Sequence, residues 1–198
     1  METVVFAARI PQTDDFEQLY PPERQAEIDR VSNERVRREK YFVWRLLECA
    51  IQKTTGEPIE NYAFEKKPNR KWVSDRLCFS LSHSDGVVVV ALSDSAVGVD
   101  IEVIRPRREG LEKSILTQRE LTELPLLDAK DSWEYIIMRW TQKESIFKAG
   151  DRNAFEPVKI ETSEYSVRSE KLEFDGESFM LSVSAPDAHK VKFEIYNF

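Results

Sequence analysis

The chain has 198 residues, of which 41% are hydrophobic and 33% charged, with two cysteines, two histidines and a formal net charge of −7. This composition is that of an ordinary globular protein and excludes a largely disordered chain. The negative charge argues against a nucleic-acid-binding protein. The cysteines match no metal or redox spacing, no apolar run approaches membrane-spanning length, and the N-terminus lacks the basic flank of a signal peptide. We therefore expect a cytoplasmic protein that binds neither nucleic acid nor membrane.

The first half of the chain predicts one strand, two helices and three further strands. In chain order these are a strand 4–10, a helix from about residue 23, a helix 35–53, and strands 62–65, 77–81 and 87–92. The segment 82–86 (SHSDG) between the last two strands is predicted to be a loop. The segment 64–76 has five basic and two acidic residues, a local positive patch suited to a small phosphorylated ligand.

The second half repeats this order of elements. It predicts a strand 96–103, helices 117–124 and 131–149, strands 158–161 and 164–168, a hairpin of 171–174 with 179–184, and a strand 191–196. Because the strands come in runs, an α+β fold is favoured over a doubly wound parallel sheet. We expect two similar α+β subdomains, 1–97 and 98–198, in a pseudo-twofold arrangement with the active-site cleft between them, and a monomer.

The helix 131–149 contains an acidic residue on its apolar face. That face comprises Trp133, Ile136, Ile137, Trp140 and Phe147. Glu144 falls at the centre of the same face, and Lys148 follows one turn later. A carboxylate directed into an apolar stripe is costly unless a cation or hydrogen bonds receive it. Glu144 therefore either lies at the wet edge of the stripe or meets a metal or a cationic partner.

Two further carboxylates share one face of the strand 96–103. Alternation directs Gly98, Asp100 and Glu102 to the same side, and residues two apart on a strand lie roughly 6.5–7 Å apart. They are either solvated acids on an exposed face or ligands that converge on one divalent cation. Together with Glu144 they form a hard-oxygen set of the kind that Mg²⁺ prefers.

Two other polar groups are candidates for a site. The segment 80–86 places three serines and His83 at the end of a strand, where hydroxyls and imidazole could contact a phosphate; a surface histidine is the alternative. Glu120 stands three residues after Thr117, which is the spacing of a helix capping box.

Three blocks in this order resemble the signature of surfactin-type 4′-phosphopantetheinyl transferases. They are FSLSHS (79–84), GVDIE (98–102) and WTQKESIFKA (140–149), and the resemblance spans roughly residues 20–150. Such enzymes move 4′-phosphopantetheine from coenzyme A to a serine of an apo acyl, polyketide or peptidyl carrier protein and release adenosine 3′,5′-bisphosphate. The family fold has two similar α+β halves with coenzyme A between them.

The resemblance implies roles for five residues in catalysis. Asp100, Glu102 and Glu144 would bind Mg²⁺, which also holds the coenzyme A pyrophosphate. Glu144 would in addition act as the base for the carrier serine, directly or through water. Lys148 would neutralise charge at the transferred phosphate or protonate the leaving group. Glu120 matches a family glutamate, so a catalytic role can coexist with the capping box.

The resemblance also implies contacts with coenzyme A. Ser82 and His83 would contact the 3′-phosphate region, and Lys71 and Lys148 would add positive charge near the phosphates. The family usually has Gly-Lys-Pro where this chain has Arg-Lys-Trp at 70–72, so the turn at Lys71 must differ.

The early helices and the carrier surface match the family less closely. Arg24 and Lys40 are candidate counterparts of basic coenzyme A contacts, but Tyr41 stands where a threonine is expected. Because the carriers of such enzymes are acidic and this chain is negative overall, we expect docking through a local basic and apolar patch. The candidates are RPRR (105–108) and the exposed part of 111–127.

Two alternative functions remain open on the sequence. A Mg²⁺-dependent nuclease would also use acidic residues and a lysine, but the lysine follows Glu144 by four positions rather than two and the chain is acidic. A non-catalytic coenzyme A-binding module would keep the cleft and lack turnover, although every chemical position is present.

Overall fold

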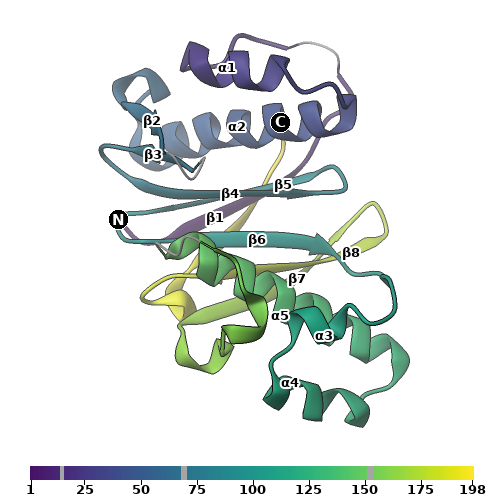
Figure 1. Cartoon of the computed structure of the whole chain (residues 1–198). Coiled ribbons are helices and arrows are strands. Elements are labelled where there is room, and N and C mark those ends of the chain that lie inside the picture. Colours follow the sequence, from purple (N-terminus) through teal and green to yellow (C-terminus); the bar gives the residue numbers. More distant parts are fainter. Residues whose placement is uncertain (14–15, 68–70, 151–153) are drawn as a thin grey trace.

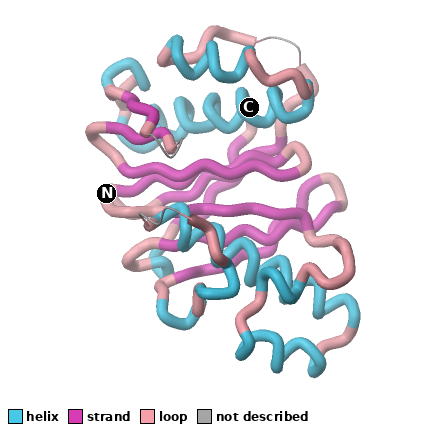
Figure 2. Tube along the Cα trace, viewed as in Figure 1, coloured by secondary structure: helices cyan, strands magenta, loops and turns pink. Residues whose placement is uncertain are grey.

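The computed structural model describes residues 1–13, 16–67, 71–150 and 154–198. Two β-sheets lie face to face in the middle of the molecule, and a long helix covers the outer face of each sheet (Figure 1). The strands thus form the interior and the helices the two outer layers (Figure 2). This mixed α+β architecture confirms the predicted fold class.

The first sheet has the order β4-β5-β1-β9 and is covered by helix α2. Its elements are β1 Val4–Arg9, β4 Cys78–Ser84, β5 Val87–Ser93, β9 Lys192–Tyr196 and α2 Glu34–Thr55, and α1 Pro22–Asp29 lies beside α2. Strand β5 is buried on both faces, which explains its unbroken apolar sequence: Val88 and Val90 pack towards α2, and Val87 and Val89 face the second sheet. Helix α2 ends at Thr55, two residues beyond the predicted end, and is capped by Gly56, whose φ of 75° suits glycine.

The second sheet has the order β6-β8-β7 and is covered by helix α5. Its elements are β6 Gly98–Val103, β7 Val167–Phe174, β8 Glu177–Ser184 and α5 Ala129–Ala149. Strands β7 and β8 form the predicted hairpin, in which Asp175 and Gly176 have φ of 51° and 81°.

The packing of α5 on its sheet differs from the predicted apolar stripe. The face that meets the sheet is made of small polar residues: Thr141 and Ser145 are fully buried, and Thr141 Oγ1 lies 2.8 Å from Ser182 Oγ. A Cβ added to Gly98 would lie 1.9 Å from the carbonyl oxygen of Ser145, so only glycine allows this approach. Trp140, from the predicted stripe, is only half-buried and lies beside the sheet contact.

Several short elements complete the chain. They are η1 Ile59–Asn61, β2 Phe64–Lys66, β3 Trp72–Ser74, α3 Glu112–Ile115, α4 Gln118–Glu123, η2 Leu124–Leu126, η3 Pro157–Lys159, η4 Thr162–Glu164 and η5 Ala188–Lys190. The predicted strand 158–161 is wrong, because a 3₁₀ turn (η3) occupies its first half and no strand follows there. The predicted strand 164–168 is also displaced, because η4 extends to Glu164 and β7 starts only at Val167. Strand β3 and helix α3 were not predicted.

The C-terminal strand crosses the predicted subdomain boundary. Strand β9 pairs in parallel with β1 and so completes the sheet of the first half. The division into 1–97 and 98–198 stays a prediction, with this strand exchanged between the halves. Among the described helices, none is both long and apolar enough to cross a membrane.

Candidate active site

The serines of β4 face the carboxylates of β6. The predicted loop 82–86 is wrong: β4 continues through Ser84, and only Asp85 and Gly86 form the turn. As a result, Ser82 and His83 point to opposite sides of one strand and do not converge on a common point. Ser82 is buried and faces β6, whereas His83 faces helix α2.

Asp100 is buried, and only one of its oxygens is bound. Its Oδ1 accepts hydrogen bonds from Ser82 Oγ at 2.7 Å and from Lys148 Nζ at 2.7 Å. Its Oδ2 is buried and has no hydrogen-bond partner in the described part of the chain. An orphaned carboxylate oxygen in such a position is costly, and a cation would satisfy it.

Glu102 lies two residues further along the same face. Its Oε2 accepts hydrogen bonds from Ser84 Oγ at 3.1 Å and from Arg107 Nη2 at 3.0 Å. Burial, followed by the charge of Asp100, raises the pKa of Glu102, and the guanidinium of Arg107 opposes that shift. The two acids of β6 therefore repel each other in a partly desolvated place.

Glu144 of α5 belongs to the same group of charges. Burial raises its pKa most, the charges of Asp100 and Glu102 raise it further, and Lys148 opposes them. The burial has a local source, because the rings of Trp140 and Phe147 flank Glu144 on its helix face and both pack on Phe155, at 5.5 and 5.2 Å between ring centroids.

Whether these carboxylates suit a metal can be judged from their chemistry. Within the described ranges, no three acidic, histidine or cysteine side chains already stand as a finished metal site. Lys148 binds one oxygen of Asp100, and Arg107 binds one oxygen of Glu102. The orphaned oxygen of Asp100 and the mutual repulsion of the acids are nevertheless what a hard divalent cation would relieve. The donor set therefore fits Mg²⁺.

Two lysines lie next to this group. Lys148 Nζ, besides binding Asp100, lies 3.3 Å from Ser82 Oγ and 3.2 Å from the carbonyl oxygen of Val99. Lys71, from the chain between β2 and β3, donates to the carbonyl oxygen of Lys148 at 2.7 Å, which brings it to the end of α5. The neighbouring Arg70 lies outside the described residues.

His83 is fixed by a residue that the sequence did not single out. Its Nδ1 lies 3.0 Å from Oε2 of Glu39, a buried residue of α2 that also accepts the backbone N–H of Gly86 at 3.1 Å. Burial acts to raise the pKa of Glu39, but the hydrogen bonds and the imidazole outweigh it, so that the pKa is lowered. The helical spacing of α2 could not show this contact, which depends on the fold.

Glu120 lies in a separate buried network. The predicted capping box is confirmed: Thr117 N donates to Glu120 Oε2, and Thr117 Oγ1 accepts from Glu120 N. Lys143, with no exposed surface, donates to Glu120 at 2.6 Å and to the carbonyl oxygens of Ile115 and Pro157 at 2.8 and 3.0 Å. The carboxylate of Glu120 is thus held by its own helix cap and by Lys143, which gives it a structural role, and the catalytic role stays a prediction.

The early helices offer less to a ligand than expected. Arg24 is buried, its guanidinium lies 4.8 Å from the centre of the Trp44 ring, and it donates to the carbonyl oxygen of Lys40 at 3.3 Å. Tyr41 is also buried and donates to the carbonyl oxygen of Glu17 at 3.0 Å. Arg24 and Tyr41 are therefore committed to the core, and Lys40 remains half-exposed.

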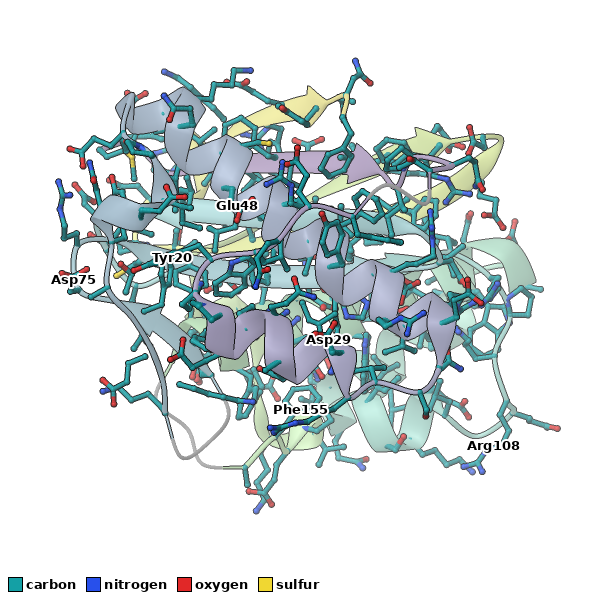
Figure 3. All side chains as sticks on the ribbon, turned by 90° about the horizontal axis from the view of Figure 1, so that it is seen from above. Tyr20, Asp29, Glu48, Asp75, Arg108 and Phe155 are labelled. Atoms are coloured by element: carbon teal, nitrogen blue, oxygen red, sulfur yellow. The ribbon has the colours of Figure 1, made fainter. Side chains whose placement is uncertain are left out.

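The three arginines of the predicted docking patch differ in their surroundings. Arg105 pairs with Asp85 at 2.7 Å, and Arg107 is held by Glu102. Arg108 is exposed and projects from the edge of the molecule (Figure 3). Beside them is a small apolar pocket of about 220 Å³, called here the Trp140 pocket, lined by Glu102, Arg107, Leu111, Ile115, Ile137 and Trp140.

A buried group of carboxylates beside lysines is typical of enzymes that act on phosphate esters, and comparison with known proteins identifies the class. The family model of the 4′-phosphopantetheinyl transferase superfamily matches residues 96–192, further towards the C-terminus than the three motifs reach. The chain is 33% identical over 131 residues to the 4′-phosphopantetheinyl transferase AcpT of Salmonella typhi. The matched segment covers 65% of this chain and 67% of that protein.

Two further relatives agree. The chain is 29% identical over 134 residues to AcpT of Escherichia coli K12, covering 66% of this chain and 67% of the relative. It is 29% identical over 111 residues to Sfp of Bacillus subtilis, covering 56% of this chain and 45% of that protein. The chain belongs to the 4′-phosphopantetheinyl transferase superfamily, a class of transferase enzymes, and is similar to its Sfp-like members.

Proposed function

We propose that this protein transfers 4′-phosphopantetheine from coenzyme A to a serine hydroxyl of an apo carrier protein in the presence of Mg²⁺ and releases adenosine 3′,5′-bisphosphate. The observation that carries the proposal is the contact between β6 and α5, in which Lys148 binds Asp100 at 2.7 Å and Glu144, one helical turn before Lys148, lies near enough to Asp100 and Glu102 for their charges to raise its pKa. These residues come from two distant segments of the chain. The proximity of these acidic and basic side chains, in a member of this superfamily, supports a site for phosphoryl transfer.

The three carboxylates would hold the metal. Asp100 would offer its orphaned Oδ2, and Glu102 and Glu144 their carboxylate oxygens, all hard donors. When bound, Mg²⁺ would neutralise charge on the pyrophosphate of coenzyme A. Lys148 would add a second positive charge from the opposite side of Asp100.

Glu144 is the residue suited to act as base. Burial and its acidic neighbours raise its pKa, so it accepts a proton more readily than an exposed glutamate does. The proton of the serine hydroxyl would pass to Glu144, directly or through water, as the serine oxygen forms its bond to phosphorus. The bond from phosphorus to the adenosine bisphosphate oxygen breaks in the same step, and Lys148 neutralises the leaving charge.

Coenzyme A would be held beside the end of α5 that Lys71 approaches, and His83 would reach it from the α2 side of β4. Lys71 lies at the end of α5 and His83 at the end of β4, where the histidine is oriented by Glu39. Ser82 takes no direct part in this binding, because its hydroxyl is used by Asp100.

The carrier would dock on the surface around the Trp140 pocket. This pocket opens beside Glu102 and is large enough, at about 220 Å³, for one apolar side chain. The exposed Arg108 stands on the loop that borders it and would attract an acidic carrier. An apolar contact near the acceptor serine, together with a basic rim, would orient the serine towards Glu144.

The proposal is tested by mass spectrometry of an apo carrier incubated with the protein, Mg²⁺ and coenzyme A. We expect a carrier heavier by one phosphopantetheine, and loss of the product with Glu144→Gln although this variant stays folded. Full activity of the Glu144→Gln variant would show that the base is assigned wrongly. Tight binding of coenzyme A with no transfer to any carrier in a panel would favour a non-catalytic binding module.

A further inference from the structure

Strands β4 and β6 belong to different sheets, yet they run alongside each other where the two sheets meet (Figure 1). Three serine side chains on one face of β4 join them in place of a backbone ladder. Ser80 Oγ accepts the N–H of Val99 at 3.0 Å, and Ser82 Oγ accepts the N–H of Ile101 at 3.3 Å. Ser84, the third, reaches the side chain of Glu102.

Two of these serines hold acidic side chains, and they do so in the same way. Ser82 donates to Oδ1 of Asp100, and Ser84 donates to Oε2 of Glu102, which Arg107 also binds. In the described part of the chain, Oδ2 of Asp100 has no partner, and no hydrogen bond reaches Oε1 of Glu102. Each carboxylate therefore has one oxygen tethered and the other open.

We infer that Ser84 is a positioning residue, which, together with Ser82, fixes the carboxylates of β6 so that their open oxygens can receive a divalent cation. The inference rests on the proposed function, since it assumes that Asp100 and Glu102 bind the metal. A glutamate has three side-chain torsions, and a free Glu102 would lose that freedom when the metal binds. A hydroxyl that holds one oxygen beforehand lowers this cost, and such outer-sphere hydrogen bonds change metal affinity by roughly 10–100-fold.

The chain provides a matched control for this role. Ser80 lies on the same face of β4 and makes the same kind of contact between the sheets, but it binds the backbone of Val99 and no carboxylate. Ser80 is also more buried than Ser84, so its removal leaves a buried N–H group without a partner. If Ser84 had a purely structural role, Ser80→Ala would be the more harmful variant in every measurement. If Ser84 positions Glu102, Ser84→Ala should mainly weaken metal binding and Ser80→Ala should mainly lower stability.

The test measures binding of Mn²⁺ to the purified protein by electron paramagnetic resonance, without and with coenzyme A, together with thermal unfolding. We expect Ser84→Ala to weaken Mn²⁺ binding roughly tenfold or more with little change in Tm. Ser84→Thr, which keeps the hydroxyl, should restore the affinity. Ser80→Ala should lower the Tm and leave the Mn²⁺ affinity within about twofold of the wild type.

The outcomes distinguish this inference from the proposed function. Unchanged Mn²⁺ affinity in Ser84→Ala would overturn the positioning role, and the metal site would stand as long as Asp100→Asn still abolishes binding. Equal losses of affinity in Ser80→Ala and Ser84→Ala would show that both serines only hold the sheets together, and would overturn the role as well. Absence of Mn²⁺ binding by the wild type under both conditions would overturn the inference and the proposed function together.

Discussion

At the scale of single residues, Glu144 is held in a state that is unfavourable for stability. Burial and the charges of Asp100 and Glu102 raise its pKa above the ordinary 4.5, so its ionisation is harder in the folded protein than in the unfolded chain. Protonated Glu144 contributes favourably to the free energy of unfolding. This contribution is fully present below the pKa of the unfolded chain and is lost as the pH rises through the higher pKa of the folded protein. At neutral pH the ionised carboxylate therefore destabilises the fold.

Because ionised Glu144 destabilises the fold at neutral pH, Glu144→Gln should be more stable than the wild type there. Removing the charge should raise the Tm at about pH 7.5 by about 2–4 °C, which for a chain of this size corresponds to about 1 kcal/mol. The gain should shrink as the pH falls through the raised pKa of folded Glu144, because the wild-type side chain then becomes protonated as well. Scanning calorimetry of both proteins across this range would check it. A Tm below that of the wild type at neutral pH would mean that the ionised Glu144 stabilises the fold.

Lys143 gives a second prediction at this scale, because it is fully buried next to Glu120. Lys143→Met should lower the free energy of unfolding by about 3–5 kcal/mol, since Glu120 would remain buried without its close partner. Adding Glu120→Gln should recover part of that loss. Urea unfolding of the wild type and the two variants measures the loss and its recovery. If Lys143→Met were as stable as the wild type but inactive, the catalytic role first expected for Glu120 would have to be reconsidered.

Arg108 and Arg107 allow a separation of carrier docking from the catalytic site. Arg108→Glu should raise the KM for an acidic carrier about five- to tenfold, or roughly 1–1.4 kcal/mol, and leave the KM for coenzyme A unchanged. Arg107→Glu should raise both and lower kcat, because Arg107 binds the carboxylate of Glu102. Steady-state kinetics with each substrate varied in turn provide the check. Equal effects of Arg108→Glu on both KM values would exclude this surface as the docking site.

At the scale of elements, the contact of α5 with β6 sets the distance between Glu144 and the acids of β6. Gly98→Ala would place a methyl carbon 1.9 Å from the carbonyl oxygen of Ser145 and 2.5 Å from the nitrogen of Ala149, both backbone atoms that cannot move alone. We expect a loss of at least about 1–3 kcal/mol of stability, and a loss of transfer activity even in the folded fraction.

The control for this variant lies at the end of the same helix. A Cβ at Gly150 would meet its nearest atom, the carbonyl oxygen of Ile146, at an ordinary 3.5 Å. Gly150→Ala should therefore change stability and activity little. Chemical unfolding and the transfer assay on both variants test the pair, and a Gly98→Ala protein with normal activity would show that the helix position is not critical.

The elements also show how far the sequence determines the site. Local patterns sufficed for the acids of β6, the helix with Glu144 and the capping box at Thr117, because alternation and helical spacing are properties of neighbouring residues. They failed at residues 82–84, where polar residues typical of a loop continue a strand, because the hydroxyls of Ser82 and Ser84 bind β6. The apolar stripe of α5 packs on a separate apolar cluster that includes Ile115 and Leu116, whereas the close approach at Gly98 requires small residues on the face of α5 that meets β6, a contact that the stripe did not predict.

At the scale of the whole molecule, the site lies where the two sheets meet, beside the end of α5. Residues from β4, β6 and α5 contribute to it, and β9 ties the end of the chain back to β1. Pairings such as His83 with Glu39 join residues 44 positions apart in the chain and are set only by the tertiary fold. No local pattern in a single sequence contains that information.

Because the site joins distant segments, its ligands should stabilise the whole molecule. At about one hundred times their Kd, Mg²⁺ and coenzyme A together should raise the free energy of unfolding by about 2.7 kcal/mol. For a chain of this size this is a rise in Tm of about 5–10 °C. Thermal shift assays would show it, and the Mg²⁺-dependent part should vanish in Asp100→Asn. A shift that is the same in that variant would place the metal elsewhere.

The central claim is that Asp100, Glu102 and Glu144 bind one divalent cation. The measurement that tests it most directly is the anomalous scattering of Mn²⁺ in crystals grown with Mn²⁺ and coenzyme A. The account predicts one strong peak with oxygen ligands about 2.1 Å away, to which each of the three carboxylates is bound either directly or through one water, and Lys148 displaced from Asp100 or shared with phosphate. A peak that Glu144 does not approach, or one bound by other residues, would contradict it.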